Sequence, residues 1–232
     1  CGDLELTNNE FNQRINQLAH ALMEMGVKKG DRVAALMANS NVFLEVLFAT
    51  SKLGVIMVPL NIRLAAPELQ FIVNDAEPVA FIYSPEFVSS VDELRGMVTS
   101  VKHFICELTG GNGGDREYES WIREKPDTEP VPNAQVGLDD GQFIMYTSGT
   151  TGKPKGALLT HGNTLWNAIN TIHAYPVAHS DVTVCCAPLF HIAALNISVT
   201  PMIYLGGKII IQRVFDAAGV LKLIEDNHAT TM

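Results

Sequence analysis

Residues 146–156 read YTSGTTGKPKG, a run that holds three glycines, three threonines, one serine and two lysines but no carboxylate. Glycine lets backbone N–H groups approach an anion closely and adopts positive φ without strain. Hydroxyl groups donate hydrogen bonds to phosphate oxygens, and each lysine adds a positive charge. Because the run follows an apolar strand and carries two lysines, it favours a loop that binds nucleotide phosphates over an ordinary polar turn.

The spacing of this loop differs from that of the common P-loop. A P-loop has four residues between its first glycine and a Gly-Lys pair, and a helix follows directly. Here two threonines separate Gly149 from Gly152, and Pro154 follows Lys153. The next residues, 157–160, are short and mostly apolar and predict a strand. The expected order is therefore strand, phosphate loop, strand, which argues against a P-loop NTPase.

Short apolar runs alternate with helical segments along most of the chain. Strands that are apolar on both faces and separated by helices are typical of a parallel sheet covered on both faces. The sequence therefore predicts an α/β fold with a mostly parallel sheet. Strands are expected at residues 33–38, 55–60, 79–83, 102–106, 142–147, 182–187 and 208–212. Helices are expected from a capping box at Thr7 to Gly26 and at residues 42–53, 67–75, 86–97, 118–122, 163–174, 192–205 and 216–227, with Asn163 and Asp216 as N-caps.

Three regions are expected along the chain. Residues 1–27 form an N-terminal helix region, residues 28–175 a first αβ subdomain that includes the loop, and residues 181–232 the start of a second αβ subdomain. The glycine- and proline-rich stretch at 109–140 is interpreted as an excursion within the first subdomain. The second subdomain is expected to be truncated, and its unfinished sheet predicts a homo-oligomer or a disordered tail.

Composition limits the classes of protein and of partner. The longest apolar runs fall short of the roughly 18 residues that span a bilayer, so no transmembrane segment is expected. Four cysteines without CxxC spacing predict free thiols in a reducing compartment, the cytoplasm. The net charge is −9 and no basic stripe is present, which argues against a nucleic-acid partner.

The charge is unevenly distributed in a way that suits a polyanion. Residues 1–140 hold 21 acidic and 11 basic residues, whereas residues 141–232 hold 4 acidic and 5 basic ones. Between Asp140 and Asp216 the only carboxylate side chain is that of Asp181. A cleft for phosphates should exclude carboxylates, because like charges repel strongly at low dielectric.

The loop resembles the phosphate-loop signature of the adenylate-forming superfamily, which includes acyl-CoA and aryl-CoA ligases, luciferases and peptide-synthetase adenylation domains. A second stretch, Pro188-Leu189-Phe190-His191, is similar to the motif that borders the acyl pocket in that family. The segments around 26–34 and 52–64 resemble the same enzymes. Within the superfamily, the sequence is most similar to the N-terminal portion of a fatty-acyl-CoA ligase.

The resemblance implies an activity and its cofactors. Members join a carboxylic acid to ATP as an acyl-adenylate and then transfer the acyl group to a thiol, so ATP, Mg²⁺ and coenzyme A are implied, with a fatty acid as the expected substrate. An aryl-acid ligase and a non-catalytic nucleotide-binding module stay open as alternatives. The later motifs of the family cannot be placed before Met232, so this chain alone is expected not to turn over.

The resemblance also assigns site residues. Phosphate binding is assigned to Thr147, Ser148, Gly149, Thr150, Thr151, Gly152 and Lys155. Thr150 is the candidate magnesium ligand, and Phe190 and His191 are expected at the acyl pocket. No catalytic residue is assigned. His161 is interpreted as structural and Trp166 as a packing residue.

Overall fold

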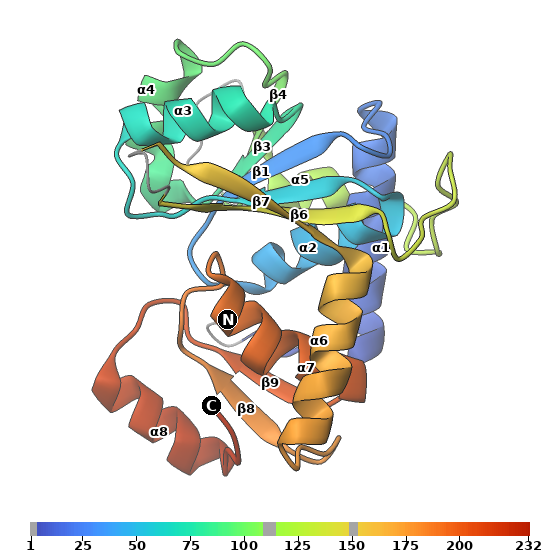
Figure 1. Ribbon diagram of the computed structural model, residues 1–232, viewed down its shortest axis with the longest axis vertical. Coiled ribbons are helices and arrows are strands. Elements are labelled where there is room, and N and C mark those ends of the chain that lie inside the picture. The colour runs from blue at the N-terminus through green and yellow to red at the C-terminus, as the bar shows by residue number, and fades with distance from the viewer. Residues whose placement is uncertain (1–3, 109–114, 149–152) are drawn as a thin grey trace.

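The computed structural model describes residues 4–108, 115–148 and 153–232 (Figure 1). Within these residues the larger sheet is parallel except for its last pair, β6 and β7. Its strands lie in the order β5 (Arg116–Glu117), β4 (His103–Cys106), β3 (Ala80–Tyr83), β1 (Arg32–Leu36), β2 (Ile56–Pro59), β6 (Gly141–Thr147) and β7 (Lys155–Thr160). The expected mostly parallel α/β sheet is confirmed.

Helices cover both faces of this sheet, as the apolar strands predict. Alternate residues of β1 enter different cores, with Val33 and Ala35 in one and Ala34 and Leu36 in the other, which is the period of two expected of a strand. The first core is covered by α1 (Asn8–Glu24), α2 (Asn41–Leu53) and α5 (Tyr118–Arg123), and the second by α3 (Ala66–Ala76) and α4 (Val88–Arg95).

Residues 181–232 form a smaller unit, coloured orange to red in Figure 1. Its two strands, β8 (Val182–Cys185) and β9 (Lys208–Ile211), pair in parallel. Its helical elements are the π-helical segment η2 (Ala194–Val199), α7 (Thr200–Leu205) and α8 (Ala217–Asn227). Leu189, Ala194, Leu195 and Val199 join the first core of the larger sheet, so the two units share apolar packing.

The element between the two units is α6 (His161–Ala174), which contacts α7 and η2 as well as β7. Its N-cap differs from the prediction. Thr160 is the cap, and its hydroxyl accepts a hydrogen bond from the backbone N–H of Asn163 at 3.2 Å. In return, the side-chain oxygen of Asn163 accepts a hydrogen bond from the Thr160 N–H at 2.9 Å. Asn163 is therefore the third residue of a capping box rather than the cap.

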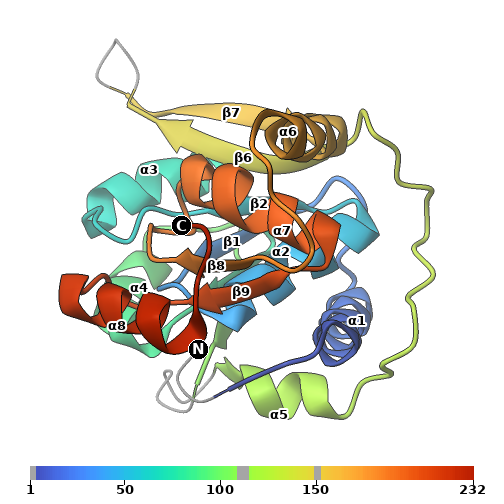
Figure 2. The ribbon, with the colours of Figure 1, turned by 90° about the horizontal axis from the view of Figure 1, so that it is seen from below.

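Two other predicted helices differ from the structure. Residues 192–205 are helical throughout, as predicted, but are π-helical at η2 before α7 begins. The helix predicted at 86–97 is shorter, because a 3₁₀ turn (Pro85–Phe87) precedes α4 (Val88–Arg95). The predicted caps at Thr7 and Asp216 are confirmed, since both side chains accept from the backbone N–H three residues on. Residues 124–140 run along the outside from α5 to β6 (Figure 2). They are the last part of the stretch 109–140 that is interpreted from the sequence as an excursion.

The described cysteines are free thiols. Cys106 and Cys185 are buried and Cys186 is half-buried. Burial, with a smaller contribution from neighbouring Cys186, raises the pKa of Cys185 to about 12, so its thiol stays protonated and unreactive at neutral pH. None of the helices in the described ranges is long and apolar enough to cross a bilayer.

Candidate active site

The predicted phosphate loop connects the two strands of the β6–β7 hairpin. Thr147 ends β6 and lies opposite Lys155, the first residue of β7. Side chains directly opposite in an antiparallel pair point to the same face, and those of Thr147, Ser148 and Lys155 are exposed. The predicted order of strand, loop and strand is confirmed. Residues Gly149, Thr150, Thr151 and Gly152 lie outside the described residues.

The base of the loop is anchored by Tyr146. Its hydroxyl donates a hydrogen bond to the carboxylate of Asp75 on α3. Burial and this contact with Asp75 raise the pKa of Tyr146 well above its usual value. The strand pairing places Gly156 beside Tyr146, and a Cβ atom on Gly156 would lie 2.7 Å from Ile144 Cγ2 and 3.1 Å from Tyr146 Cζ. Gly156 is therefore required for packing against the ring and not for positive φ.

The two lysines of the loop are available to neutralise the negative charge of a ligand. Within the described ranges, neither Lys153 nor Lys155 takes part in an ion pair. The one carboxylate of this half before Asp216, that of Asp181, accepts hydrogen bonds from the Ala178 N–H at 2.6 Å and the Thr230 hydroxyl at 2.8 Å. It is thus engaged in a turn of the smaller unit.

The second predicted motif, residues 188–191, follows β8 and leads into η2. Leu189 is buried, Phe190 is half-buried against the first core, and His191 is exposed. The Nδ1 atom of His191 accepts a hydrogen bond from the Ala193 N–H at 3.2 Å. Because Nδ1 is the acceptor, the neutral ring carries its proton on Nε2 and can donate it to a ligand.

Both motifs lie at one edge of the larger sheet. β6 runs parallel to β2, and β2 runs parallel to β1, so the end of β6 at Thr147 lies at the same edge as the end of β1. Asn39, three residues beyond β1, accepts a hydrogen bond from the Leu189 N–H at 2.8 Å. Ligands of open α/β sheets bind outside the carboxyl ends of their strands, and both motifs lie at that edge.

The chain matches the AMP-binding enzyme family over residues 2–232. This chain belongs to the AMP-binding enzyme family. It is 38% identical to a feruloyl-CoA synthase of Amycolatopsis sp over 99% of this chain and 43% of that protein. It is 36% identical to an indoleacetate–CoA ligase of Aromatoleum aromaticum, over 93% of this chain and 42% of that protein. A long-chain fatty acid–CoA ligase of Mycobacterium tuberculosis is also 36% identical, over 97% and 43%.

Solved structures agree with this membership. An inhibitor-bound N-terminal domain of FACL13 from Mycobacterium tuberculosis superposes with a TM-score of 0.88 at 34% identity, over 98% of this chain and 55% of that one. An anthranilate CoA ligase in complex with anthranoyl-AMP gives a TM-score of 0.93 at 28% identity, over 98% of this chain and 44% of that one. The chain thus spans under half the length of the curated relatives named above.

A polar clamp joins the two units of this AMP-binding family member at the same edge. Arg213, after β9, binds the carboxylate of Glu86 at 2.9 and 3.0 Å and that of Glu107 at 3.2 and 3.1 Å. Glu107 is buried and also accepts from the Ser84 hydroxyl, which in turn accepts from the Ala38 N–H at 3.2 Å. A buried carboxylate needs such partners.

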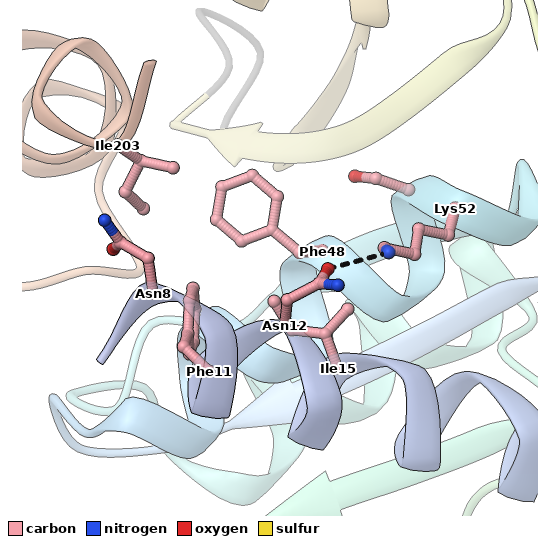
Figure 3. Close-up of a pocket in the computed structure, with 8 residues that line it drawn as sticks. Asn8, Phe11, Asn12, Ile15, Phe48, Lys52 and Ile203 are labelled. Atoms are coloured by element: carbon pink, nitrogen blue, oxygen red, sulfur yellow. Dashed lines mark hydrogen bonds between the residues drawn. The ribbon is translucent and has the colours of Figure 1, made fainter. Parts of the chain in front are cut away.

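A hollow of about 500 Å³ lies elsewhere, between α1, α2 and α7 (Figure 3). Phe11, Phe48 and Ile203 supply apolar walls, and Lys52 donates to Asn12 at 2.9 Å at its rim. The Lys52 ammonium is already paired with Glu129 at 2.6 Å. No residue assigned to phosphate or acid binding lines this hollow, so we do not treat it as the active site.

The other site assignments stay predictions. Across the described ranges, no group of three His, Cys, Asp or Glu side chains could enclose a metal ion, and Thr150 lies outside them. The loop offers hydroxyls without carboxylates, a donor set that fits a Mg²⁺ ion already carried on phosphates rather than a protein cage. Asn39 was missed from sequence. Its signal was its place just after a buried strand, at the edge where ligands bind.

Proposed function

We propose that this chain is the N-terminal portion of an ATP-dependent acid–CoA ligase that makes an acyl-adenylate and then a CoA thioester. The observation that carries the proposal is that the phosphate-loop hairpin and the Pro188–His191 segment lie at the same carboxyl edge of the sheet. Membership of the AMP-binding family supports it. The names of its relatives, three acid–CoA ligases, support the reaction class.

The reaction would proceed in two steps. A carboxylate oxygen of the acid attacks the α-phosphorus of ATP, the bond to the bridging oxygen breaks, and pyrophosphate leaves. The CoA thiol, on losing its proton, then attacks the acyl carbon, and AMP leaves as the thioester forms. A carboxylate alone is a poor acyl donor because its leaving group is oxide, so the enzyme mainly positions reactants and stabilises charge on phosphorus.

The loop would hold the pyrophosphate part of ATP. Its amides and hydroxyls, from Thr147 to Gly152, would donate to phosphate oxygens, and Lys155 would supply charge from the first position of β7. Bound Mg²⁺ would neutralise phosphate oxygens, with Thr150 as the proposed protein ligand. Phe190 and His191 would border the acyl group, with the Nε2 proton of His191 available to an oxygen of the acid.

A fatty acid is the proposed substrate, and the long-chain fatty acid–CoA ligase among the relatives supports it. An aryl acid is the second candidate, favoured by the feruloyl-CoA synthase and the indoleacetate–CoA ligase. The complete protein that contains this chain should be assayed for ATP- and CoA-dependent thioester formation with palmitate, octanoate, ferulate and indoleacetate. Thioester formation with none of these acids would argue for the alternative, a nucleotide-binding module without chemistry.

Substitution of Lys155 tests the phosphate assignment. Lys155→Ala in the complete protein should weaken MgATP binding by about 1.5–3 kcal/mol, the range of a hydrogen bond to a charged group. Lys222→Ala, which removes an exposed lysine from α8, is the matched control and should leave the affinity unchanged. Equal MgATP dissociation constants for all three proteins, measured by calorimetry, would remove Lys155 from the site.

The wider biology is also proposed. We place the protein in the cytoplasm, as its free thiols suggest, with ATP, CoA and a carboxylic acid as partners and without nucleic acid. We expect this 232-residue chain alone not to turn over, because the relatives are more than twice its length. Sustained pyrophosphate release by the chain with acid and MgATP would contradict this expectation.

A further inference from the structure

One side-chain amide links the centre of the larger sheet to the smaller unit. Asn39 is 7% exposed and lies between β1 and Ser40, the N-cap of α2. Its Nδ2 group donates to the Ala187 carbonyl at 2.9 Å and to the Gln212 carbonyl at 3.1 Å. Its Oδ1 atom accepts from the Leu189 N–H at 2.8 Å. One amide therefore holds the segments that follow both β8 and β9.

The two contacts with residues 187 and 189 enclose Pro188, which has no N–H of its own. The contacts onward to the histidine come from within the same segment, since the His191 N–H donates to the Pro188 carbonyl at 3.0 Å and the Ala194 N–H to the His191 carbonyl at 3.1 Å. The amide of Asn39 thus fixes the beginning of a short chain of contacts that ends at the His191 ring.

Asn39 lies between two regular, largely buried elements. A buried strand precedes it and the first turn of α2 follows it, with the Ser40 hydroxyl accepting from the Phe43 N–H at 3.3 Å. The segment that it holds is less regular, because residues 186–191 belong to no strand or helix and lead through one short helical step at 192–193 into the π-helical η2. Supporting hydrogen bonds from rigid elements are what keep functional side chains in register.

We propose that Asn39 is the positioning residue for the acid-binding segment, acting through the backbone of residues 187–189 to set where Phe190 and His191 meet the acid. This proposal rests on the proposed function above. It assigns Asn39 no contact with substrate, and it predicts that the loss of its amide impairs use of the acid and spares the binding of ATP at the β6–β7 hairpin.

Two substitutions in the complete protein separate this role from general stability. Asn39→Ala removes the hydrogen bonds to Ala187, Leu189 and Gln212 and should lower kcat/KM for the acid about ten- to hundredfold, with KM for MgATP within about twofold of wild type. Asn16→Ala is the matched control, because Asn16 is also buried, at 2% exposed, and donates to the Asp127 carbonyl at 2.8 Å away from the segment. It should lower Tm without changing the ratio of the two KM values.

Asn39→Asp gives a signature that depends on pH. The ionised carboxylate still accepts from Leu189 but repels the carbonyls of Ala187 and Gln212, whereas the protonated form regains one donor. Burial beside carbonyls raises the pKa of such a carboxyl. The defect of Asn39→Asp in KM for the acid, relative to wild type, should therefore shrink as pH falls from 8 to 6. A defect that is independent of pH would contradict the proposal.

Hydrogen exchange tests the hold on the segment without any assay of activity. In Asn39→Ala the Leu189 amide should exchange at least about tenfold faster than in wild type, while in Asn16→Ala it should not. If Asn39→Ala does not fold, Asn39→Asp carries the same measurement at pH 6 and 8. Unchanged exchange at Leu189, or an active Asn39→Ala enzyme with an unaltered KM for the acid, would overturn the proposal. Absence of thioester formation by wild type would instead reject the proposed function.

Discussion

Gly156 illustrates how a glycine in the phosphate motif can serve packing. Its φ is not in the positive region where glycine is favoured, and its backbone pairs with Tyr146 across the hairpin. The ring of Tyr146 and the γ2 methyl of Ile144 occupy the space where a side chain would stand. The residue thus supports the anchor between Tyr146 and Asp75 at the base of the loop.

Gly156→Ala should therefore destabilise the chain by about 1–3 kcal/mol, the usual cost of overpacking. Urea unfolding measures the change in free energy. Gly96→Ala is the matched control, since a Cβ atom at Gly96 meets nothing within 4 Å and its φ is −73°. If Gly156→Ala and Gly96→Ala unfold at the same urea concentration, the Tyr146 ring does not need the space over Gly156.

His161 should make stability depend on pH. Burial lowers the pKa of His161, and attraction to Asp140 opposes this without cancelling it; its Nε2 atom is buried without a hydrogen-bond partner in the described structure. Because the folded state binds the proton less readily than the unfolded state, the free energy of unfolding is highest above the unfolded pKa of about 6.5. It falls as pH decreases from there toward the lowered folded pKa.

His161→Gln should flatten that decrease between pH 7 and 5, measured by chemical unfolding at each pH. His173→Gln, an exposed position on the same helix, is the control and should keep the slope of wild type. A slope that is identical in His161→Gln and wild type would show that the imidazole of His161 takes up its proton equally well in both states.

At the scale of elements, local chemistry was enough to predict the sheet and the hairpin. The alternation of apolar strands and helices specified the layers, and Pro154 with the apolar residues 157–160 specified a strand after the loop. The start of α6, which was predicted at the wrong residue, shows the limit of prediction from local sequence. Thr160 and Asn163 are both good N-caps, and a capping box contains both, so composition alone could not tell which one begins the helix.

Long-range polar contacts could not be predicted in this way. Asn39 is separated by about 150 residues from Leu189, and Arg213 by 106 from Glu107. The local sequence gives no indication that Asn39, beside the N-cap of α2, forms hydrogen bonds with the smaller unit. The π-helical turn of η2 was likewise hidden, because its apolar spacing is close to that of an α-helix. π-Helical turns occur often at functional sites, and this one begins at Ala194, shortly after His191.

At the scale of the whole molecule, large apolar side chains stay exposed on the elements after the loop. Leu158 on β7, Trp166 on α6, Ile197 on η2 and Tyr204 on α7 are each between 56% and 59% exposed. β7 is also the edge strand of the larger sheet. The interpretation of Trp166 as a packing residue is therefore wrong for the chain as described, since the indole is mostly open to solvent.

An open edge with apolar side chains favours association with a second copy. We therefore expect this chain alone to self-associate, with an average mass that rises above the monomer value of 25.3 kDa as its concentration increases. Leu158→Lys places a charge on the edge strand and should shift the average mass toward that of the monomer. Val131→Lys, in the stretch 124–140 between α5 and β6 and 81% exposed, should not. Light scattering over a hundredfold range of concentration distinguishes the two. A monomer throughout, with residues 181–232 protected from hydrogen exchange, would mean that the smaller unit is stable without a partner on β7.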